Sequence, residues 1–276
     1  MDRWLINGEL ADSLPVTDRG LQYGDGLFET MALRGGKIRL LEQHLGRLTI
    51  SCKRLGIPTD CLQDLAVALD RCIASAPHGT VKIIVTRGTG PRGYALPQQS
   101  KATICIGFAA DAVADTQPAP ARIIFCATPI ARNVVLAGLK TLNRLEQVMA
   151  RAEWSADAGI DEGLMSNDRG EVVCGTMTNL FIVRENTLIT PLLDEAGVRG
   201  VMRTHILGLA AEMNIKVQES HLLPADVESA DAVFLTNALK GVWPVAEIAG
   251  QVVASSNLVA ELQATLTASF AAGDAG

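Results

Sequence analysis

The sequence predicts an α/β protein with two domains. Its 276 residues exceed the usual size of a single core. Amphipathic helical patterns alternate along it with short strands rich in β-branched residues. The stretch DAVADTQPAPA, residues 111–121, is poor in large apolar side chains and contains two prolines, which is typical of a linker. We therefore expect a smaller domain at 1–112, a linker at 113–121 and a larger domain at 122–276.

The N-terminal half shows strand and helix patterns in turn. Strands are expected at residues 2–7 and 31–39, with loops in the polar, glycine-interrupted segment TDRGLQYGDGLFET between them. Apolar residues spaced by three and four predict two helices, with the faces Leu41, Leu45, Leu48, Cys52, Leu55 and Cys61, Leu65, Leu69, Cys72, Ile73. Further strands at 80–88 and 101–109 flank the loop GTGPRGYALPQQS.

The C-terminal half continues the alternation. A helix is expected from about residue 141 to 157, and an Asn-Asp-Arg-Gly turn should join two strands near 162–167 and 171–174. The other expected elements are strands at 122–128, 179–185 and 232–237, and helices at 200–213 and from Asn257 onward.

Composition narrows the classes of function. With a net charge of -6 and no basic stripe, the chain is not expected to bind nucleic acid. The N-terminal MDRWLINGELAD does not resemble a secretory signal, and no apolar run is long enough for a membrane span, so we expect a cytoplasmic protein. The six cysteines form no CxxC pair and the four histidines are scattered, which disfavours zinc sites and disulfides. No GxSxG motif indicates a serine hydrolase, and a small-molecule substrate becomes the default.

The stretch GTGPRG, residues 88–93, fits the pattern GxGxxG and follows a predicted strand. A dinucleotide-binding loop must open a helix, whereas Pro91, Tyr94 and Pro97 lead here to another strand. Nucleotide binding is therefore disfavoured. The loop is either a plain hairpin connection or an arm that presents Arg92 and Tyr94 to an anionic ligand.

A candidate anion site lies in DEAGVRGVMRTHIL, residues 194–207. Gly197 and Gly200 precede a predicted helix, and its first amides, those of Val201 and Met202, lack partners within the helix. Phosphate suits such a helix N-terminus, and an ordinary helix start is the alternative interpretation.

Two basic residues are candidates for chemistry. Lys140 stands where the apolar run VVLAGL meets a predicted helix. A cation opposes the helix dipole there, so a solvated surface lysine is the plain interpretation. The apolar run would instead desolvate the ammonium and favour the neutral, nucleophilic amine. Arg47 lies beside the apolar face of its helix, where a guanidinium either leans inward or stays solvated. A phosphate site with an activated lysine hints at pyridoxal phosphate.

Eight segments in chain order carry a resemblance to a known superfamily. They are LINGE, SLPVTDRGLQYGDGLFET, HLGRL, TRGTGPRGY, AGLKTLNRLEQVMARAE, DEGLMSNDRGEVVCGTMTNLFIV, GVRGVMR and FLTNALKGVWPV. Together they cover nearly the whole chain and resemble the fold-type IV pyridoxal-phosphate enzymes. Within that superfamily, LKTLNRLEQ and RGTGPRGY look most like the aminodeoxychorismate lyases, which form 4-aminobenzoate in folate synthesis. Branched-chain and D-amino-acid aminotransferases are the nearest alternatives.

The resemblance implies a small and a larger α/β domain, a homodimer, and one pyridoxal 5'-phosphate in each interdomain cleft. Lys140 would bind the cofactor covalently and act as a base once the substrate amine has displaced it. The other implied cofactor contacts are Arg47, Cys174, Val201, Met202, Asn237 and Ala238. Arg92 and Tyr94 would reach the substrate carboxylates, and the implied substrate set also includes Thr30 and Asn143. Asn143 would either help to position the base or simply cap or pack.

One position departs from the family pattern. Where the family places a glutamate that keeps a proton on the pyridine nitrogen, four residues after the turn glycine Gly170, this chain has Cys174. Glu171 should lie on the opposite face of its strand and so does not replace that glutamate. A thiol with an ordinary pKa of about 8.5 is a weak partner for a pyridinium. We take this as support for a lyase, because aromatisation of its product supplies driving force that transamination lacks.

Three hypotheses remain distinct at this point. A lyase needs no oxo-acid acceptor and releases pyruvate, whereas an aminotransferase requires the acceptor. A non-catalytic binding module would form no covalent bond with the cofactor, and the presence of Lys140 together with Arg47 argues against it.

Overall fold

The computed structural model describes residues 3–73, 76–110 and 117–272. The predicted linker at 113–121 therefore lies partly outside the described residues. Among the described residues, no helix is long and apolar enough to cross a bilayer. The chain divides into two compact units, and each has a sheet of its own.

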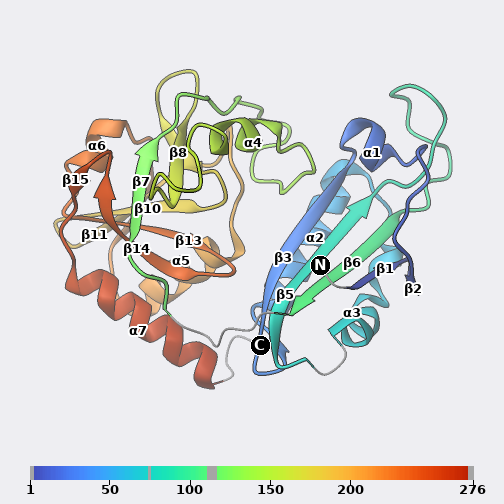
Figure 1. Cartoon of the computed structure of the whole chain (residues 1–276), viewed down its shortest axis with the longest axis horizontal. Coiled ribbons are helices and arrows are strands. Elements are labelled where there is room, and N and C mark those ends of the chain that lie inside the picture. The colour runs from blue at the N-terminus through green and yellow to red at the C-terminus, as the bar shows by residue number, and fades with distance from the viewer. Residues whose placement is uncertain (1–2, 74–75, 111–116, 273–276) are drawn as a thin grey trace. The chain divides into compact units, whose positions relative to one another are not determined.

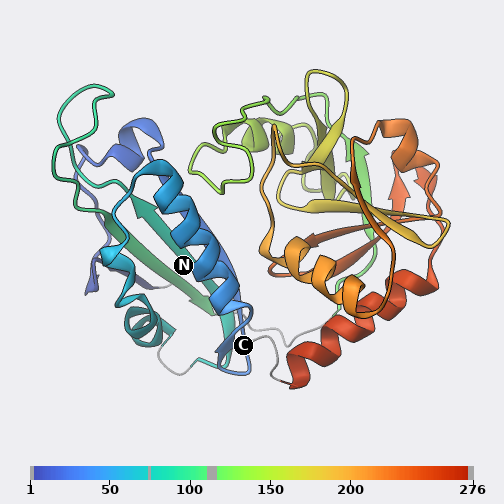
Figure 2. The same ribbon diagram turned by 180° about the vertical axis from the view of Figure 1, so that it is seen from behind.

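The first unit contains the described residues up to 110, whose strands and helices are labelled in Figure 1. The short segment Lys140–Asn143 also belongs to this unit. Its six strands form an antiparallel sheet in the order β2-β1-β6-β5-β3-β4. Helix α2 lies across one face of this sheet, as Figure 2 shows, and α3 packs against β1 and β6. The elements are β1 (Arg3–Ile6), β2 (Glu9–Leu10), α1 (Arg19–Tyr23), β3 (Gly26–Arg34), β4 (Lys37–Ile38), α2 (Leu41–Leu55), the 3₁₀ turn η1 (Asp60–Leu62), α3 (Leu65–Ile73), β5 (His78–Thr86) and β6 (Thr103–Ala110).

The segment TDRGLQYGDGLFET is more ordered than predicted. Instead of loops only, it forms α1 and the first residues of β3, so the strand expected at 31–39 begins at Gly26 and ends at Arg34. Polarity misled the prediction because the acidic residues here are buried with partners. Asp18, for example, caps α1 by accepting from the amide of Gly20 at 2.8 Å, and it also accepts from two threonine hydroxyls.

The buried face of α2 also differs from the apolar pattern. Its buried residues are His44, Leu48, Ser51 and Cys52, whereas Leu41, Leu45 and Leu55 are only half-buried. The helix is therefore turned so that His44 points into the unit. A polar residue is tolerated there because a carboxylate on β3 pairs with it.

The second unit contains a mixed sheet in the order β12-β11-β10-β13-β14-β7-β8-β9, with β15 paired to β14. Helix α5 packs against β13, α7 packs against β14, and the two helices contact each other. The elements are β7 (Ala121–Phe125), α4 (Leu145–Arg151), β8 (Glu162–Ser166), β9 (Val172–Gly175), β10 (Asn179–Arg184), β11 (Thr187–Pro191), α5 (Val201–Glu212), β12 (Val217–Ser220), α6 (Pro224–Glu228), β13 (Ala232–Asn237), β14 (Gly241–Ile248), β15 (Gln251–Val252) and α7 (Asn257–Ala272).

Two predicted helices are shorter than expected. The helix predicted at 141–157 is α4, which begins only at Leu145 and ends at Arg151. Its expected first turn is instead extended chain that pairs with β3, and Lys140 is consequently not at a helix start. The helix expected from Cys61 begins at Leu65, after the 3₁₀ turn η1.

A pair of aromatic rings lies at the centre of the second unit. Phe181 on β10 and Phe234 on β13 are opposite each other in the sheet, and their rings stack with centroids 4.8 Å apart. Both side chains are completely buried. Stacking of this kind adds to the stabilisation that comes from burial of apolar area.

Phe234→Ala should lower the free energy of unfolding by about 3–5 kcal/mol, because the truncation leaves a cavity in a close-packed core. Val252→Ala is the control: that side chain is 88 % exposed, and the change should stay within about 0.5 kcal/mol. Urea unfolding followed by circular dichroism measures both. Equal losses for the two variants would contradict this assignment of the core.

Candidate active site and cofactor-binding residues

Lys140 is held against the edge of β3 by its own backbone. Phe28 donates its amide hydrogen to the carbonyl of Lys140 at 3.0 Å, and Leu142 donates to the carbonyl of Gly26 at 3.0 Å. These bonds make residues 140–142 a short antiparallel addition to the sheet, with Leu27 opposite Thr141. Lys140 therefore stands directly opposite Phe28, and the two side chains share one face of the sheet.

Phe28 supplies the apolar surroundings of the lysine. The Nζ of Lys140 lies 4.1 Å from the centroid of the Phe28 ring. The apolar run before Lys140 contributes less than predicted, because Val134 and Val135 are 67 % and 78 % exposed. Thr30 is two residues beyond Phe28 on the same strand, so it lies on the same face as the lysine.

The guanidinium of Arg47 leans inward from α2. This is the first of the two predicted alternatives, the other being a solvated side chain. Its guanidinium makes a bidentate pair with Glu29 of β3: Nε donates to Oε1 at 2.7 Å, and Nη2 donates to Oε2. His44, one turn earlier on α2, donates from Nδ1 to Oε2 of the same carboxylate at 2.7 Å. Glu29 and His44 are each 1 % exposed. A buried carboxylate is thus held by two side chains of one helix face.

The charges in this cluster follow from its contacts. Burial alone would raise the pKa of Glu29, but hydrogen bonds from His44 and Arg47 outweigh it and hold the pKa below the ordinary value. Burial pushes the pKa of His44 below its ordinary value, and the nearby charges of Arg47 and Lys140 act in the same direction, while Glu29 opposes them. At neutral pH, Glu29 is therefore ionised and His44 is uncharged.

The loop after β5 connects two antiparallel strands and opens no helix. Gly88 is in the left-handed region with φ +82°, and an added Cβ would collide with the carbonyl of Lys101, so glycine is required. Arg19 ties the loop down by donating to the carbonyl of Gly93 at 3.0 Å. Arg92 and Tyr94 are both exposed, and the Tyr94 ring meets that of Tyr23 edge to face at 5.5 Å.

Asn143 shows a packing contact. Its side-chain amide donates to the carbonyl of Gly24 at 3.3 Å, just after α1. Residues 140–143 are not helical, so Asn143 does not belong to the first turn of the helix that was predicted from about residue 141. The contact instead fastens the short segment that carries the lysine.

In the second unit, Val201 and Met202 form the first turn of α5 after the N-cap Gly200. The N-cap is a glycine and, within the described part of the chain, makes no side-chain cap, so the first amides are candidate donors for a ligand. Asn179 at the start of β10 packs so closely against Gly200 that a Cβ there would overlap its Oδ1. Its Nδ2 donates to the carbonyl of Val198 at 2.9 Å, which fixes the loop ahead of the helix.

Asn237 is the last residue of β13, and Ala238 follows it in the turn that leads to β14. The Oδ1 of Asn237 accepts from the amides of Leu239 at 3.0 Å and Lys240 at 2.9 Å. Thr236, the preceding residue, is opposite Asn179 in the sheet. The turn and the start of α5 are therefore both linked to Asn179, at one end of the same sheet.

Cys174 is a buried, uncharged thiol on β9, opposite Met165 of β8. Burial, and after it the negative charge of Glu162, raises the pKa of Cys174 to about 12. Glu162 is itself fully buried and accepts hydrogen bonds from Thr176 and Thr178. The position where the superfamily has a carboxylate thus carries no charge in this chain.

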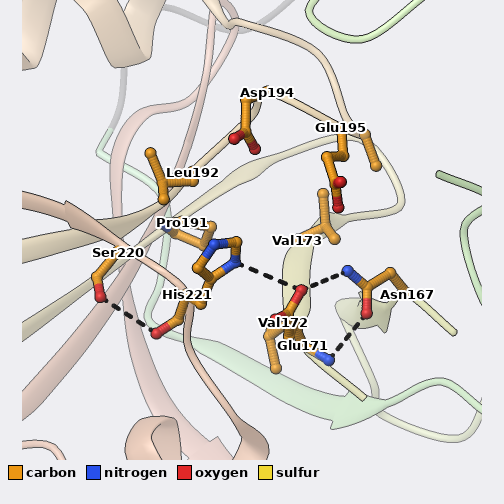
Figure 3. A pocket seen from close by; sticks show the side chains of 11 residues that line it. Asn167, Glu171, Val172, Val173, Pro191, Leu192, Asp194, Glu195, Ser220 and His221 are labelled. Carbon is orange, nitrogen blue, oxygen red and sulfur yellow. Dashed lines mark hydrogen bonds and ion pairs between the residues drawn. The ribbon is translucent and has the colours of Figure 1, made fainter. Parts of the chain in front are cut away.

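Glu171, three residues before Cys174, has its carboxylate paired with other side chains. Its carboxylate accepts from Nδ2 of Asn167 at 2.8 Å and pairs with Nδ1 of His221 at 3.4 Å, as Figure 3 shows. These residues line a cavity of about 10 Å³, which suits about one water molecule. Glu171 is therefore used to fix the turn after β8 and the start of β9.

Each unit, taken by itself, offers donors of a kind that suits a phosphate-bearing aldehyde such as pyridoxal phosphate. Lys140 offers a primary amine beside an aromatic ring, and Arg47 offers a guanidinium held in one orientation. The uncapped start of α5 offers backbone amides. Among the described residues, no group of three or more His, Cys, Asp or Glu side chains could hold a metal ion.

Sequence reasoning missed Glu29, His44 and Asn179. Apolar periodicity did not indicate Glu29 or His44, because both side chains are polar. The spacing of four residues between His44 and Leu48 could have indicated that His44 lies on the buried face of its helix. Asn179 immediately precedes the strand LFIV and gave no signal of its own. Its role depends on the close approach of Gly200, which only the tertiary structure reveals.

Residues 26–248 match the family described as amino-transferase class IV. The chain therefore belongs to this family. The predicted family and the fold-type IV architecture are confirmed. A crystal structure of 4-amino-4-deoxychorismate lyase from Pseudomonas aeruginosa is 42 % identical, with a TM-score of 0.87, and the match covers 96 % of this chain and 98 % of that one.

Two curated relatives are equally similar in identity. Aminodeoxychorismate lyase of Vibrio harveyi is 32 % identical over 249 residues, which covers 88 % of this chain and 90 % of the relative. A putative branched-chain-amino-acid aminotransferase of Methanocaldococcus jannaschii is 32 % identical over 273 residues, which covers 96 % and 94 %. These two relatives therefore do not separate lyase from aminotransferase.

His44 should make stability depend on pH near neutrality. Its pKa in the folded chain lies below 6.5, its ordinary value, so the unfolded chain binds more protons as the pH falls below about 6.5. Between pH 7 and pH 5, wild type should therefore lose up to about 1.4 kcal/mol of unfolding free energy per pH unit relative to His44→Asn. Denaturant unfolding at several pH values measures the slopes. Parallel lines for wild type and His44→Asn would contradict the prediction.

Proposed function

We propose that this chain is a pyridoxal-phosphate-dependent lyase that converts 4-amino-4-deoxychorismate to 4-aminobenzoate and pyruvate. The observation that carries the proposal is the fixed position of Lys140, whose amine lies over the Phe28 ring in the same unit as Arg47. The 42 % identity to the Pseudomonas aeruginosa lyase over nearly the whole of both chains supports the same reaction here. The product places the enzyme in folate synthesis.

The cofactor contacts follow from the donors described above. Lys140 is the covalent attachment point, and Arg47 is the cationic anchor for the phosphate. The amides of Val201 and Met202 and the turn at Asn237–Ala238 are the proposed further phosphate contacts. When bound, pyridoxal phosphate supplies an electron sink for a substrate carbanion.

The chain's own residues then have separable tasks. The Nζ of Lys140 takes the proton from the ring carbon that bears the substrate amine. Thr30, on the same sheet face, is the proposed polar contact beside it. Arg92 and Tyr94, on the exposed loop, are proposed to bind substrate carboxylates, and Asn143 holds the segment of the lysine.

An aminotransferase is the second candidate, and the Methanocaldococcus jannaschii relative favours it. The residue at position 174, a cysteine, disfavours an aminotransferase. A neutral thiol gives little stabilisation to a proton on the pyridine nitrogen, and transamination depends on that stabilisation more than a lyase does. Aromatisation of the ring provides a driving force that is independent of Cys174.

We also propose a homodimer located in the cytoplasm. The chain's match to its relatives over almost their full length supports the same assembly as in the superfamily it resembles. An exposed tyrosine and arginine on one loop, Tyr94 and Arg92, suit residues that complete a site in a second copy.

Lys140→Ala should abolish production of 4-aminobenzoate, with a rate loss of at least about 10³-fold, because both the attachment point and the base are removed. The assay supplies enzymatically made aminodeoxychorismate, without an oxo acid, and measures 4-aminobenzoate and pyruvate. Lys82→Ala is the matched control, since the Nζ of Lys82 also lies near the Phe28 ring, at 5.3 Å, but on the neighbouring strand. Product formation by Lys140→Ala at the wild-type rate would refute the proposal.

Cys174→Glu should raise side transamination more than it raises lyase turnover, because a carboxylate there would hold a proton on the pyridine nitrogen. The ratio of alanine-dependent transamination to 4-aminobenzoate formation measures this. Cys126→Glu, at a half-buried thiol nearby, controls for the introduction of charge. An unchanged ratio in Cys174→Glu would show that position 174 does not tune the reaction.

A further inference from the structure

The carboxylate of Glu29 is completely enclosed, and both of its oxygens are used. Oε1 accepts from Nε of Arg47, and Oε2 accepts from Nη2 of Arg47 and Nδ1 of His44. Glu29 belongs to β3 and its two partners belong to α2, so the contact joins the strand that holds Lys140 to the helix that carries the phosphate anchor.

The tautomer of His44 follows from its partner. Glu29 is ionised and His44 is uncharged, so the proton on the imidazole must sit on Nδ1, facing the carboxylate. The opposite nitrogen, Nε2, is buried without a hydrogen-bond partner among the described residues. The only N–H of His44 therefore donates to Glu29, while Nε2 stays buried without a partner among the described residues. Because an unsatisfied buried nitrogen costs stability, we infer that the bond that orients Glu29 is worth that cost.

The carboxylate has two opposing effects on a phosphate at Arg47. Its negative charge repels the phosphate, because the two groups would face the same guanidinium. It also fixes the guanidinium, since two of the five N–H donors are engaged in a bidentate pair and the direction of the other donors is thereby set. A long arginine side chain otherwise loses substantial rotamer freedom when it binds an anion.

We propose that Glu29 is a positioning residue that orients Arg47 for the cofactor phosphate, and that His44 in turn orients Glu29. This inference rests on the proposed function, in which Arg47 is the phosphate anchor. The gain from a preset guanidinium exceeds the repulsion between carboxylate and phosphate. Removing the charge of Glu29 distinguishes the two effects. The affinity for the cofactor phosphate falls if orientation dominates and rises if repulsion dominates.

Asp18 provides a matched control within the same unit. It is also a buried carboxylate, but its hydrogen bonds come from the hydroxyls of Thr86 and Thr103 and the amide of Gly20. Asp18→Asn therefore measures what the loss of a buried carboxylate does to the unit in general. It removes no partner of Arg47.

The experiment compares pyridoxal phosphate with pyridoxal, which has the same aldehyde and no phosphate. Absorbance titrations of apoprotein give the affinity of each for wild type, Glu29→Gln and Asp18→Asn. Glu29→Gln should weaken pyridoxal phosphate about tenfold or more, the size expected when a charge-assisted hydrogen bond is lost, and should change pyridoxal by less than about twofold. Asp18→Asn should leave the ratio of the two affinities at the wild-type value.

A second pair of variants tests His44 and covers the case in which Glu29→Gln does not fold. His44→Leu removes the donor to Glu29 and should weaken pyridoxal phosphate selectively. His44→Asn should restore most of the affinity, because its amide nitrogen takes the place of Nδ1. Equal affinities of His44→Leu and wild type for pyridoxal phosphate would overturn the role of His44.

The remaining outcomes separate this inference from the proposed function. Glu29→Gln binding pyridoxal phosphate as tightly as wild type, or more tightly, would overturn the positioning role, as would an equal loss for pyridoxal. Wild type that binds pyridoxal phosphate but makes no 4-aminobenzoate would refute the proposed reaction while the affinity ratios still support Glu29. Wild type that binds neither compound would overturn both.

Discussion

Two backbone hydrogen bonds between β3 and residues 140–142 are the constraint on which the candidate site depends. They make Lys140 part of the first unit, although the residues on both sides of this segment belong to the second. The lysine therefore stands opposite Phe28 on a rigid sheet edge rather than on a flexible connection. Because an antiparallel pair fixes which side chains share a face, the same two bonds also put Thr30 and the lysine on one face of the sheet.

Two buried carboxylates and one half-buried carboxylate organise the polar segment that leads into β3. Asp18 caps α1, Asp25 pairs with Arg19 and Arg87, and Glu29 pairs with Arg47 and His44. For Asp25, burial would raise the pKa, but the hydrogen bonds and charges of the two arginines outweigh it and lower the pKa. Each acid is compensated by close donors, as buried charges must be. The segment is thus stabilised by paired acids, and it includes Glu29, the partner of Arg47.

In the second unit, the candidate anion-binding groups belong to the backbone. Asn179 is linked to the loop before α5 and, through its strand neighbour Thr236, to the turn after β13. This arrangement depends on backbone amides and small residues, since Gly200 leaves room for the amide side chain. Backbone amides at the start of a helix are groups that can bind a phosphate dianion.

The sequence by itself determined the class of fold, most of the helices and strands, and the identity of Lys140 and Arg47 as candidates. Those features are local: helical and strand periodicity appear within a few residues, and the reactive residue types can be read directly. The tertiary structure alone decided that residues 140–142 are extended, that α2 turns His44 inward, and that Glu29 holds Arg47. These depend on hydrogen bonds and ion pairs between segments far apart in the chain, and such pairing leaves no periodic pattern in either segment alone.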